Sequence, residues 1–388
     1  MISPVALRPA VGLFSGIGGL ELGLRKAGFE AVLLADNYEP ASHVLRVRFP
    51  DAKLFEDVRD LTSIPPETEI LAAGFPCQDL SSVGPKTGIE GTRSSLVGEV
   101  FRLISQTPVP WLVLENVPFI LSLDKGRAIS LVTSALDELG YQWAYRVIDA
   151  QCFGIPQRRR RWFLVASLVG DPRAVLLEQE AKPRTPDPDP ECYGFYWTEG
   201  TRALGWAPNV VPPLKCGSTV GVASPPAIFT SERRIVLPDI RDAERLQGFR
   251  VDWTRPAEEV AKPGFRWKLV GNAVSVKSAE WVAQRIALNP KGYDQSHDVL
   301  IEPGSRWPNA AWGGAGRTFA SPRSDCPVWK KSSSVESFLR YPTKPLSERA
   351  CRGFLSRVEK GSLRVMPEFI DAVHRQIRDW EGGFVEFK

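Results

Sequence analysis

The first 165 residues alternate short apolar runs with amphipathic stretches. The apolar runs are typical of buried strands, and they lie at 11–14, 31–36, 69–75, 111–117, 141–150 and 161–167. Helical spacing fills the stretches between them, at 18–28, after the second strand as far as Phe49, at 95–104 and at 128–140. This alternation predicts a doubly wound, mostly parallel α/β sheet, in which ligands bind at the carboxyl ends of the strands.

The pattern changes after residue 165. Residues 183–191 are rich in proline and acidic side chains, which predicts a linker or surface loop. From about residue 289 the chain is rich in loop residues. Helical spacing returns in four places, at 241–249, 278–288, 347–360 and 367–381.

The composition narrows the picture only a little. With 388 residues, 43% of them hydrophobic, the chain can bury a large core in two or three domains. A net charge of +4 gives weak support for a nucleic-acid partner. The six cysteines include no CxxC pair, so no metal site is expected. With no leader and no long apolar run, we expect reduced thiols, a cytoplasmic protein and no membrane contact.

Two motifs follow predicted strands. The glycine-rich segment FSGIGG (14–19) opens a helix whose backbone donors suit an anionic ligand, although a tight turn alone would also use these glycines. Cys77 follows the strand 69–75, which makes its thiol a candidate nucleophile at a strand end. The alternative is that Cys77 is a small buried hydrophobe.

Charged side chains follow two further strands. Glu115 comes after four apolar residues, so it points into the same crevice as Cys77, unless it only caps the next helix. In QRRRR (157–161), side-chain alternation places Arg159 and Arg161 on one face, where they can meet phosphates. The alternative is a solvated basic run.

The order of the motifs points to one family. FSGIGG, GFPCQDLS, ENV, QRRRR, ERLQGF and VGNAVS follow one another along the chain. This series resembles the ordered motifs of the DNA (cytosine-5)-methyltransferase family, over residues 11–165 and 212–288. The resemblance implies the S-adenosylmethionine-dependent methyltransferase fold with a smaller recognition domain. It also implies methylation of carbon 5 of cytosine in double-stranded DNA, with S-adenosyl-L-methionine as cofactor.

The resemblance assigns a role to each candidate catalytic residue. Cys77 adds to carbon 6 of a cytosine that has flipped out of the duplex, and Glu115 contacts N3 and the exocyclic amine. Arg159 and Arg161 orient the base and the loop that carries the cysteine. Covalent addition makes carbon 5 nucleophilic enough to take the methyl group, and loss of the carbon-5 proton then expels Cys77.

Further residues match the family's cofactor positions: Phe14, Gly16, Gly18, Gly19, Asn37, Asp57, Val58, Pro76, Leu96, Asn272, Ala273 and Val274. Asp57 is expected to read the adenine amine. Asn37 stands where the family usually has an acid for the ribose hydroxyls, so Asp36 or Glu39 is an alternative ribose ligand. Gly12 also departs from the family, in which an acid is common at this position.

The distribution of charge suggests where DNA is recognised. Residues 166–211 hold four Lys and Arg against seven Asp and Glu, whereas residues 303–365 hold twelve against four. We therefore expect recognition to be largely carboxy-terminal. The alternative is that Trp307, Trp312 and Trp329 pack this extension beneath the sheet. The expected DNA-contacting residues are Gln78, Ser81, Arg245, Arg317, Arg323, Lys330 and Lys331.

These expectations divide the chain into three parts. They are a catalytic domain of 1–165 and 266–288, a short acidic insert or linker of 166–211, and a smaller recognition region of 212–265 and 289–388.

Three functions remain open from the sequence. The first is a sequence-specific DNA methylase that works in restriction–modification or protection. The second is a tRNA cytosine methyltransferase of the same fold, and the third a non-enzymatic binding protein on a decayed scaffold. The catalytic motifs disfavour the third function, and the basic extension favours duplex DNA. By resemblance we expect a monomer, bacterial or phage-encoded, beside a separately acting cognate restriction endonuclease.

Overall fold

The structure is a computed structural model that describes residues 8–76, 95–183, 185, 187–217, 225–302, 304–363 and 365–382. The chain divides into two compact units. Unit 1 consists of Met1–Cys152, Arg160–Lys182 and Val274–Trp329. Unit 2 consists of Phe153–Arg159, Pro183–Ala273 and Lys330–Lys388. Among the described residues, no helix is long and apolar enough to cross a membrane.

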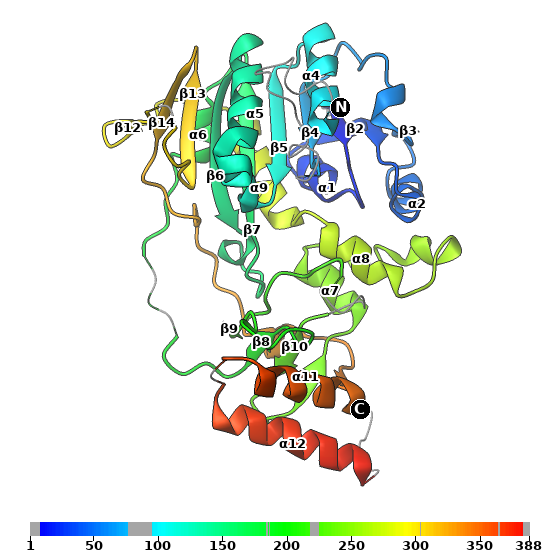
Figure 1. Cartoon of the computed structure of the whole chain (residues 1–388). Helices are drawn as coiled ribbons and strands as arrows, with labels where there is room; N and C mark the ends of the chain where they lie inside the picture. Colours follow the sequence, from blue (N-terminus) through cyan, green and yellow to red (C-terminus); the bar gives the residue numbers. More distant parts are fainter. Residues whose placement is uncertain are drawn as a thin grey trace, which may run out of the picture. The chain divides into compact units, whose positions relative to one another are not determined.

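Unit 1 is built on a ten-stranded sheet (Figure 1). Its strands are β1 (Arg8–Leu13), β2 (Phe29–Ala35), β3 (Lys53–Phe55), β4 (Ile70–Ala73), β5 (Trp111–Asn116), β6 (Gln142–Asp149), β7 (Arg160–Ser167), β12 (Val299–Leu300), β13 (Ala310–Gly314) and β14 (Arg317–Ala320). Their order is β12-β14-β13-β6-β7-β5-β4-β1-β2-β3. The strands from β3 to β5 are parallel, and those from β7 to β12 are antiparallel.

The parallel core confirms the predicted α/β class. β4 and β5 are buried along their whole length, which explains why they read as continuous apolar runs. The helices of this unit are α1 (Gly19–Lys26), α2 (Glu39–Arg48), α4 (Leu96–Gln106), α5 (Arg127–Glu138), α6 (Pro172–Leu176) and α9 (Val276–Leu288). α4 and α5 pack their apolar faces on one side of the sheet, while α1, α6 and α9 lie against one another on the other side (Figure 1).

The segment 289–329 differs from its predicted place. It was expected in the recognition region, but it belongs to unit 1, where β12, β13 and β14 extend the sheet beyond β6. Buried Ala310 and Ala311 pair with β6, and the Trp307 ring lies 6.5 Å from that of Trp143. The physical reason is that β6 would otherwise be an open edge, and these strands cover it.

Two cysteines depart from the prediction of reduced thiols. Cys152 and Cys326 form a disulfide across 174 positions of sequence, with their Cα atoms 5.6 Å apart. A backbone hydrogen bond of 2.8 Å from Asp149 N to Asp325 O brings the two segments together. A long-range contact of this kind leaves no local sequence signal, so the prediction was wrong for this pair.

Unit 2 contains a five-stranded antiparallel sheet in the order β15-β11-β10-β8-β9. The strands are β8 (Tyr193–Phe195), β9 (Ala207–Pro208), β10 (Ala227–Phe229), β11 (Ile235–Leu237) and β15 (Lys344–Pro345). The helices are α7 (Ile240–Leu246), α8 (Phe265–Asn272), α10 (Val335–Phe338), α11 (Glu348–Lys360) and α12 (Pro367–Glu381).

The described residues of both units also form short 3-10 helices: η1 (Val58–Asp60), η3 (Pro118–Leu121), η4 (Leu123–Gly126), η5 (Ala150–Cys152) and η6 (Arg255–Glu259).

Distant parts of the sequence build the core of unit 2. Phe195 of β8 and Phe229 of β10 pack with Phe354 of α11 and Phe369 of α12, with ring centroids 4.9 to 5.7 Å apart. The predicted insert 166–211 therefore supplies two strands to a folded unit, together with the carboxy-terminal helices. Burial of large aromatic faces explains why these segments associate.

Candidate active site

Three strand ends of unit 1 meet at one point. A Cβ placed on Gly74, just after β4, would lie 3.6 Å from Glu115 Oε2 and 3.7 Å from Phe14 O. Gly74 N also donates to Leu13 O at 3.3 Å, which joins the ends of β4 and β1. The turn after β1 and the acid of β5 therefore share the carboxyl edge of the parallel strands, as the sequence predicts.

Glu115 is paired with Arg161. Oε1 lies 3.2 Å from Arg161 Nε, and the two side chains are 9% and 16% exposed. The antiparallel register of β5 and β7 sets this contact, because Glu115 lies opposite Phe163 and Asn116 opposite Trp162. A nearly buried carboxylate beside a fixed guanidinium can accept or hold a proton at a ligand without first shedding water.

Asn116 is a site residue that sequence reasoning missed. Its Nδ2 donates to Phe75 O at 2.9 Å, which fixes the segment immediately before Pro76. Pro76 is exposed at the last position described before the gap. Cys77, Gln78 and Ser81 lie outside the described residues. The sequence feature that could have identified Asn116 is its position directly after the acid in ENV, at a strand end from which an amide can reach the neighbouring strand.

Arg159 is buried in unit 2 at 1% exposure. Its guanidinium donates to Leu214 O at 3.0 Å, Gly271 O at 3.0 Å and Ala273 O at 2.7 Å. These bonds fix the turn that carries Asn272, whose own side chain is exposed. The predicted alternation holds, because Arg158 and Arg160 are exposed while Arg159 and Arg161 are not.

The turn after β1 has the backbone of a close ligand approach. Phe14 and Gly16 have φ of 54° and 55°, and Gly18, which precedes α1, has φ of 82°. A Cβ on Gly16 would meet nothing within 4 Å, so space is open above the turn. Open space over a turn at a helix N-terminus fits the aminoacyl end of S-adenosylmethionine.

Asp36, at the end of β2, is held by this turn. Its Oδ2 accepts from Gly16 N at 2.7 Å and its Oδ1 from Tyr38 N at 2.9 Å. Burial raises the pKa of Asp36, which these two backbone bonds oppose. Both oxygens of Asp36 are thus engaged, and Glu39 pairs with Arg46 at 3.1 Å, whereas the neighbouring Asn37 is exposed.

Three more predicted cofactor residues lie at element starts. Asp57 caps η1, where its side chain bonds that of Arg59 and accepts from Arg59 N at 2.9 Å. These bonds hold the pKa of Asp57 below its usual value, so it is an ionised acceptor. Val58 is buried beside it, and Leu96 is the first residue of α4.

The predicted DNA-contacting residues lie in different surroundings. Arg245 pairs with Asp242 and donates to Phe338 O at 2.8 Å, inside unit 2. Arg323 is partly buried, 5.7 Å from the Tyr293 ring centroid. Lys330 and Lys331 are exposed in unit 2.

Arg317 lies at the wrong end of the sheet for a contact near Glu115. It pairs with Gly314, beside Gly313, which pairs with Trp143 near the start of β6. The start of β6 runs alongside the end of β7 and the start of β5. Arg317 therefore sits at the amino end of β5, whereas Glu115 sits near its carboxyl end.

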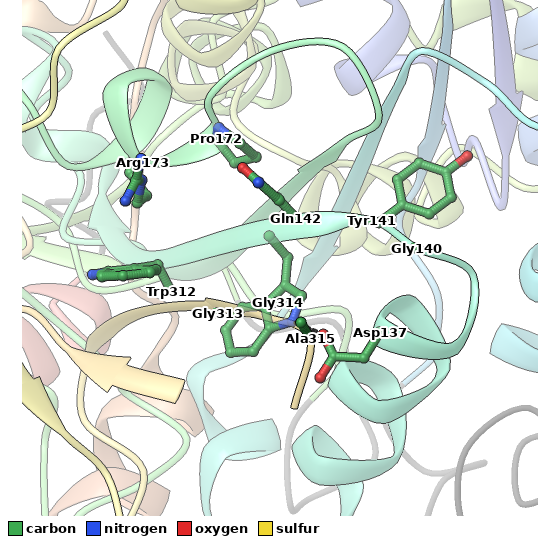
Figure 2. Close-up of a pocket in the computed structure, with 11 residues that line it drawn as sticks. Asp137, Gly140, Tyr141, Gln142, Pro172, Arg173, Trp312, Gly313, Gly314 and Ala315 are labelled. Atoms are coloured by element: carbon green, nitrogen blue, oxygen red, sulfur yellow. Dashed lines mark hydrogen bonds between the residues drawn. The ribbon is translucent and has the colours of Figure 1, made fainter. Parts of the chain in front are cut away.

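A cavity of about 320 Å³ lies at this same far end of unit 1, between β6, β13, α5 and α6 (Figure 2). Asp137 in its wall accepts from Trp143 Nε1 at 2.9 Å and from Gly316 N at 3.1 Å. Arg173 lies 4.8 Å from the Trp312 ring centroid and pairs with Asp171 at 2.9 Å. The charged side chains that line this cavity are thus already partnered, and the cavity is not the active site.

No group of His, Cys, Asp and Glu within the described ranges could hold a metal ion.

A parallel α/β core with a glycine turn after β1 and an acid–arginine pair at the carboxyl edge is the arrangement that the sequence predicts for an S-adenosylmethionine-dependent transferase. The family model for C-5 cytosine-specific DNA methylases matches residues 10–203. The chain is 44% identical to type II methyltransferase M2.BsuMI of Bacillus subtilis (strain 168), over 94% of this chain and 97% of that protein. It is 34% identical to type II methyltransferase M.MspI of Moraxella sp over 41% of this chain and 38% of that protein.

The solved structures add a likeness of fold. A mutant of Spodoptera frugiperda DNMT2 matches with a TM-score of 0.51 at 15% identity, over 72% of this chain and 99% of that one. From these matches, the chain belongs to the C-5 cytosine-specific DNA methylase family. It is a DNA (cytosine-5)-methyltransferase, the first of the three functions that the sequence left open. The family uses S-adenosylmethionine as its methyl donor.

Proposed function

We propose that this enzyme methylates cytosine within one short DNA sequence, as the modification half of a type II restriction–modification system, with Cys77 as its nucleophile. The full-length likeness to a type II methyltransferase supports the biological role. The observation that carries the chemistry is the Glu115–Arg161 pair on β5 and β7, beside Gly74 at the end of β4, the strand that Cys77 follows in the sequence. A separate endonuclease of the same specificity, and action as a monomer, belong to this proposal.

In this mechanism the chain's own residues activate the base. Cys77 adds to carbon 6 of the flipped cytosine, and Glu115 binds the N3 edge, where negative charge would otherwise build. Arg161 holds the Glu115 carboxyl in place, and Asn116 holds the strand before the nucleophile. The turn from Phe14 to Gly18 would hold S-adenosylmethionine, which would supply an electrophilic methyl group for carbon 5.

The bonds of Arg159 suggest a different role from the one that the motif implies. Its guanidinium donates to three backbone carbonyls of unit 2, so we assign it to holding the segment with Asn272 and Ala273 in place. Arg161 is then the arginine of this pair that acts on the catalytic acid.

Bisulfite sequencing tests this function directly. Total DNA from a methylation-free bacterial host that expresses the chain is expected to carry methylated cytosine in one short motif. DNA from cells with the Cys77→Ser variant, at equal expression, is expected to carry none, because the serine hydroxyl is a far weaker nucleophile at neutral pH. Unmethylated DNA beside well-expressed soluble protein would contradict the proposal, and transfer to tRNA would then be measured.

Exposed lysines of unit 2 are expected to contact DNA phosphates. Replacing Lys330 and Lys331 by alanine should weaken DNA binding and lower the slope of log K against log salt by about 2, since each phosphate contact releases about one counterion. Arg317→Ala is the matched control, because this exposed arginine lies at the far end of unit 1. Salt titrations followed by fluorescence anisotropy measure the DNA affinity and the salt slope of each variant and of the wild type. Equal slopes for the lysine variant and the wild type would remove these lysines from the interface.

A further inference from the structure

Glycine in the middle of β1 makes room for a carboxyl group. A Cβ on Gly12 would lie 2.2 Å from Glu21 Oε1 and 2.8 Å from Ser15 Oγ. Real Cβ atoms do not approach so closely. Residue 12 must therefore be glycine as long as the Glu21 carboxyl, from the first turn of α1, fills that space. α1 therefore places a carboxyl group against the middle of β1.

Among the described residues, this buried carboxyl has no ion-pair partner. Glu21 is 1% exposed and lies beside the buried Ser15 hydroxyl. Burial raises the pKa of Glu21 to about 7; the backbone and the Ser15 hydroxyl lower this pKa, and the negative charge of Asp36 raises it further.

The cations near Glu21 are already engaged elsewhere. Arg25 of α1 pairs with Glu30 of β2 at 2.6 Å. Lys26 of α1 and Lys277 of α9 both pair with Glu280, each at 3.3 Å. β1 contributes no titratable group between Val11 and Leu13. Burying a carboxyl with no counter-charge is costly, which suggests that its partner arrives with a ligand.

We propose that Glu21 is a positioning residue for the cofactor turn, and that it ionises when the ammonium group of the zwitterionic methionine end of S-adenosylmethionine occupies the site above Phe14 to Gly18. This inference rests on the proposed cofactor site. The turn connects Glu21 with the proposed ligand site. It runs from Phe14 at the end of β1 to Gly18 before α1. Ser15 lies beside Glu21, and Gly16 N donates to Asp36. A cation above the turn favours the charged form of the acid below it.

Proton release on binding is the measurement. S-adenosylhomocysteine, a stable probe that keeps the ammonium group, is titrated calorimetrically at pH 7 in two buffers of different ionisation enthalpy. The wild type is expected to release about half a proton, because a group with a pKa of about 7 is half protonated there. The Glu21→Gln variant is expected to release none and to bind about tenfold more weakly, since the negative charge that attracts the ammonium group above the turn is lost. Its KM for S-adenosylmethionine should rise similarly, with kcat nearly unchanged.

A swap of the carboxyl between elements tests the geometry. Gly12→Asp alone should destabilise the protein, because its Cβ collides with Glu21. Combined with Glu21→Ala it should recover both stability and cofactor affinity, because β1 then carries the acid. No recovery in the double variant would count against the positioning role.

The ligand-free protein gives an independent control for folding. A carboxyl whose folded pKa of about 7 exceeds the unfolded value of 4.5 binds its proton more tightly when folded, so wild-type stability should fall as pH rises from 4.5 to 7. Thermal unfolding of Glu21→Gln should show a flatter pH dependence across this window. Identical profiles for the two proteins would show that Glu21 does not titrate as argued.

Two outcomes separate this inference from the site on which it rests. Gly16→Val fills the open space above the turn and should abolish cofactor binding. If Gly16→Val binds S-adenosylhomocysteine normally, the proposed cofactor site is wrong. If Gly16→Val fails to bind, but wild type and Glu21→Gln release equal numbers of protons, only the role of Glu21 is wrong.

Discussion

Replacing Glu115 by glutamine should lower the single-turnover rate of methyl transfer by about 10³-fold, because proton transfer by a positioned acid contributes about 10² to 10⁴. Glutamine keeps the shape of the side chain but can neither carry the proton nor hold the charge that faces cytosine N3. It also leaves Arg161, which is 16% exposed, without the carboxylate that it contacts at 3.2 Å. The loss should therefore appear in the chemical step more than in binding.

The experiment compares three proteins on one duplex that contains the methylation site found by bisulfite sequencing. Rapid-quench transfer of labelled methyl groups gives the rate, and DNA affinity is measured in parallel. Glu67→Gln is the matched control, because Glu67 is an exposed acid of the same unit and should behave as wild type. A Glu115→Gln rate within threefold of the wild type would exclude Glu115 from the chemistry.

Replacing Arg159 by alanine should cost unit 2 about 3 kcal/mol or more of unfolding free energy. The change removes three charge-assisted hydrogen bonds from a side chain that is 1% exposed, and it leaves the carbonyls of Leu214, Gly271 and Ala273 without this donor. Arg159→Lys should recover only part of the loss, because one ammonium cannot reproduce the planar fork of donors.

Denaturant unfolding, followed by tryptophan fluorescence, measures this effect. Arg158→Ala is the matched control, since its neighbouring arginine is exposed and should change stability by less than about 0.5 kcal/mol. Equal stability of the Arg158 and Arg159 variants would show that the three carbonyl contacts contribute nothing.

The sequence by itself determined the central part of the fold. β4 and β5 are buried on both faces, so each had to be a continuous apolar run, and the amphipathic stretches between strands had to be helices. Strand ends in a parallel sheet share one edge, so Glu115 is expected to point into the same crevice as Cys77, which lies outside the described residues. The structure places the turn after β1 at the same edge as Glu115. Alternation along QRRRR also separated the exposed arginines from the buried ones.

Only the tertiary structure decided what those residues touch. Arg159 and Arg161 share a face by sequence, yet one binds three carbonyls and the other a carboxylate, because different chain segments lie beside each. The Cys152–Cys326 disulfide, the strands from 299 to 320 and the antiparallel sheet of unit 2 all join segments far apart in the chain. Local periodicity reports which face of an element is buried, but it carries no information about which distant segment buries it. Gly12 shows the same limit, because its meaning depends on a carboxyl nine positions away that folding alone brings into its place.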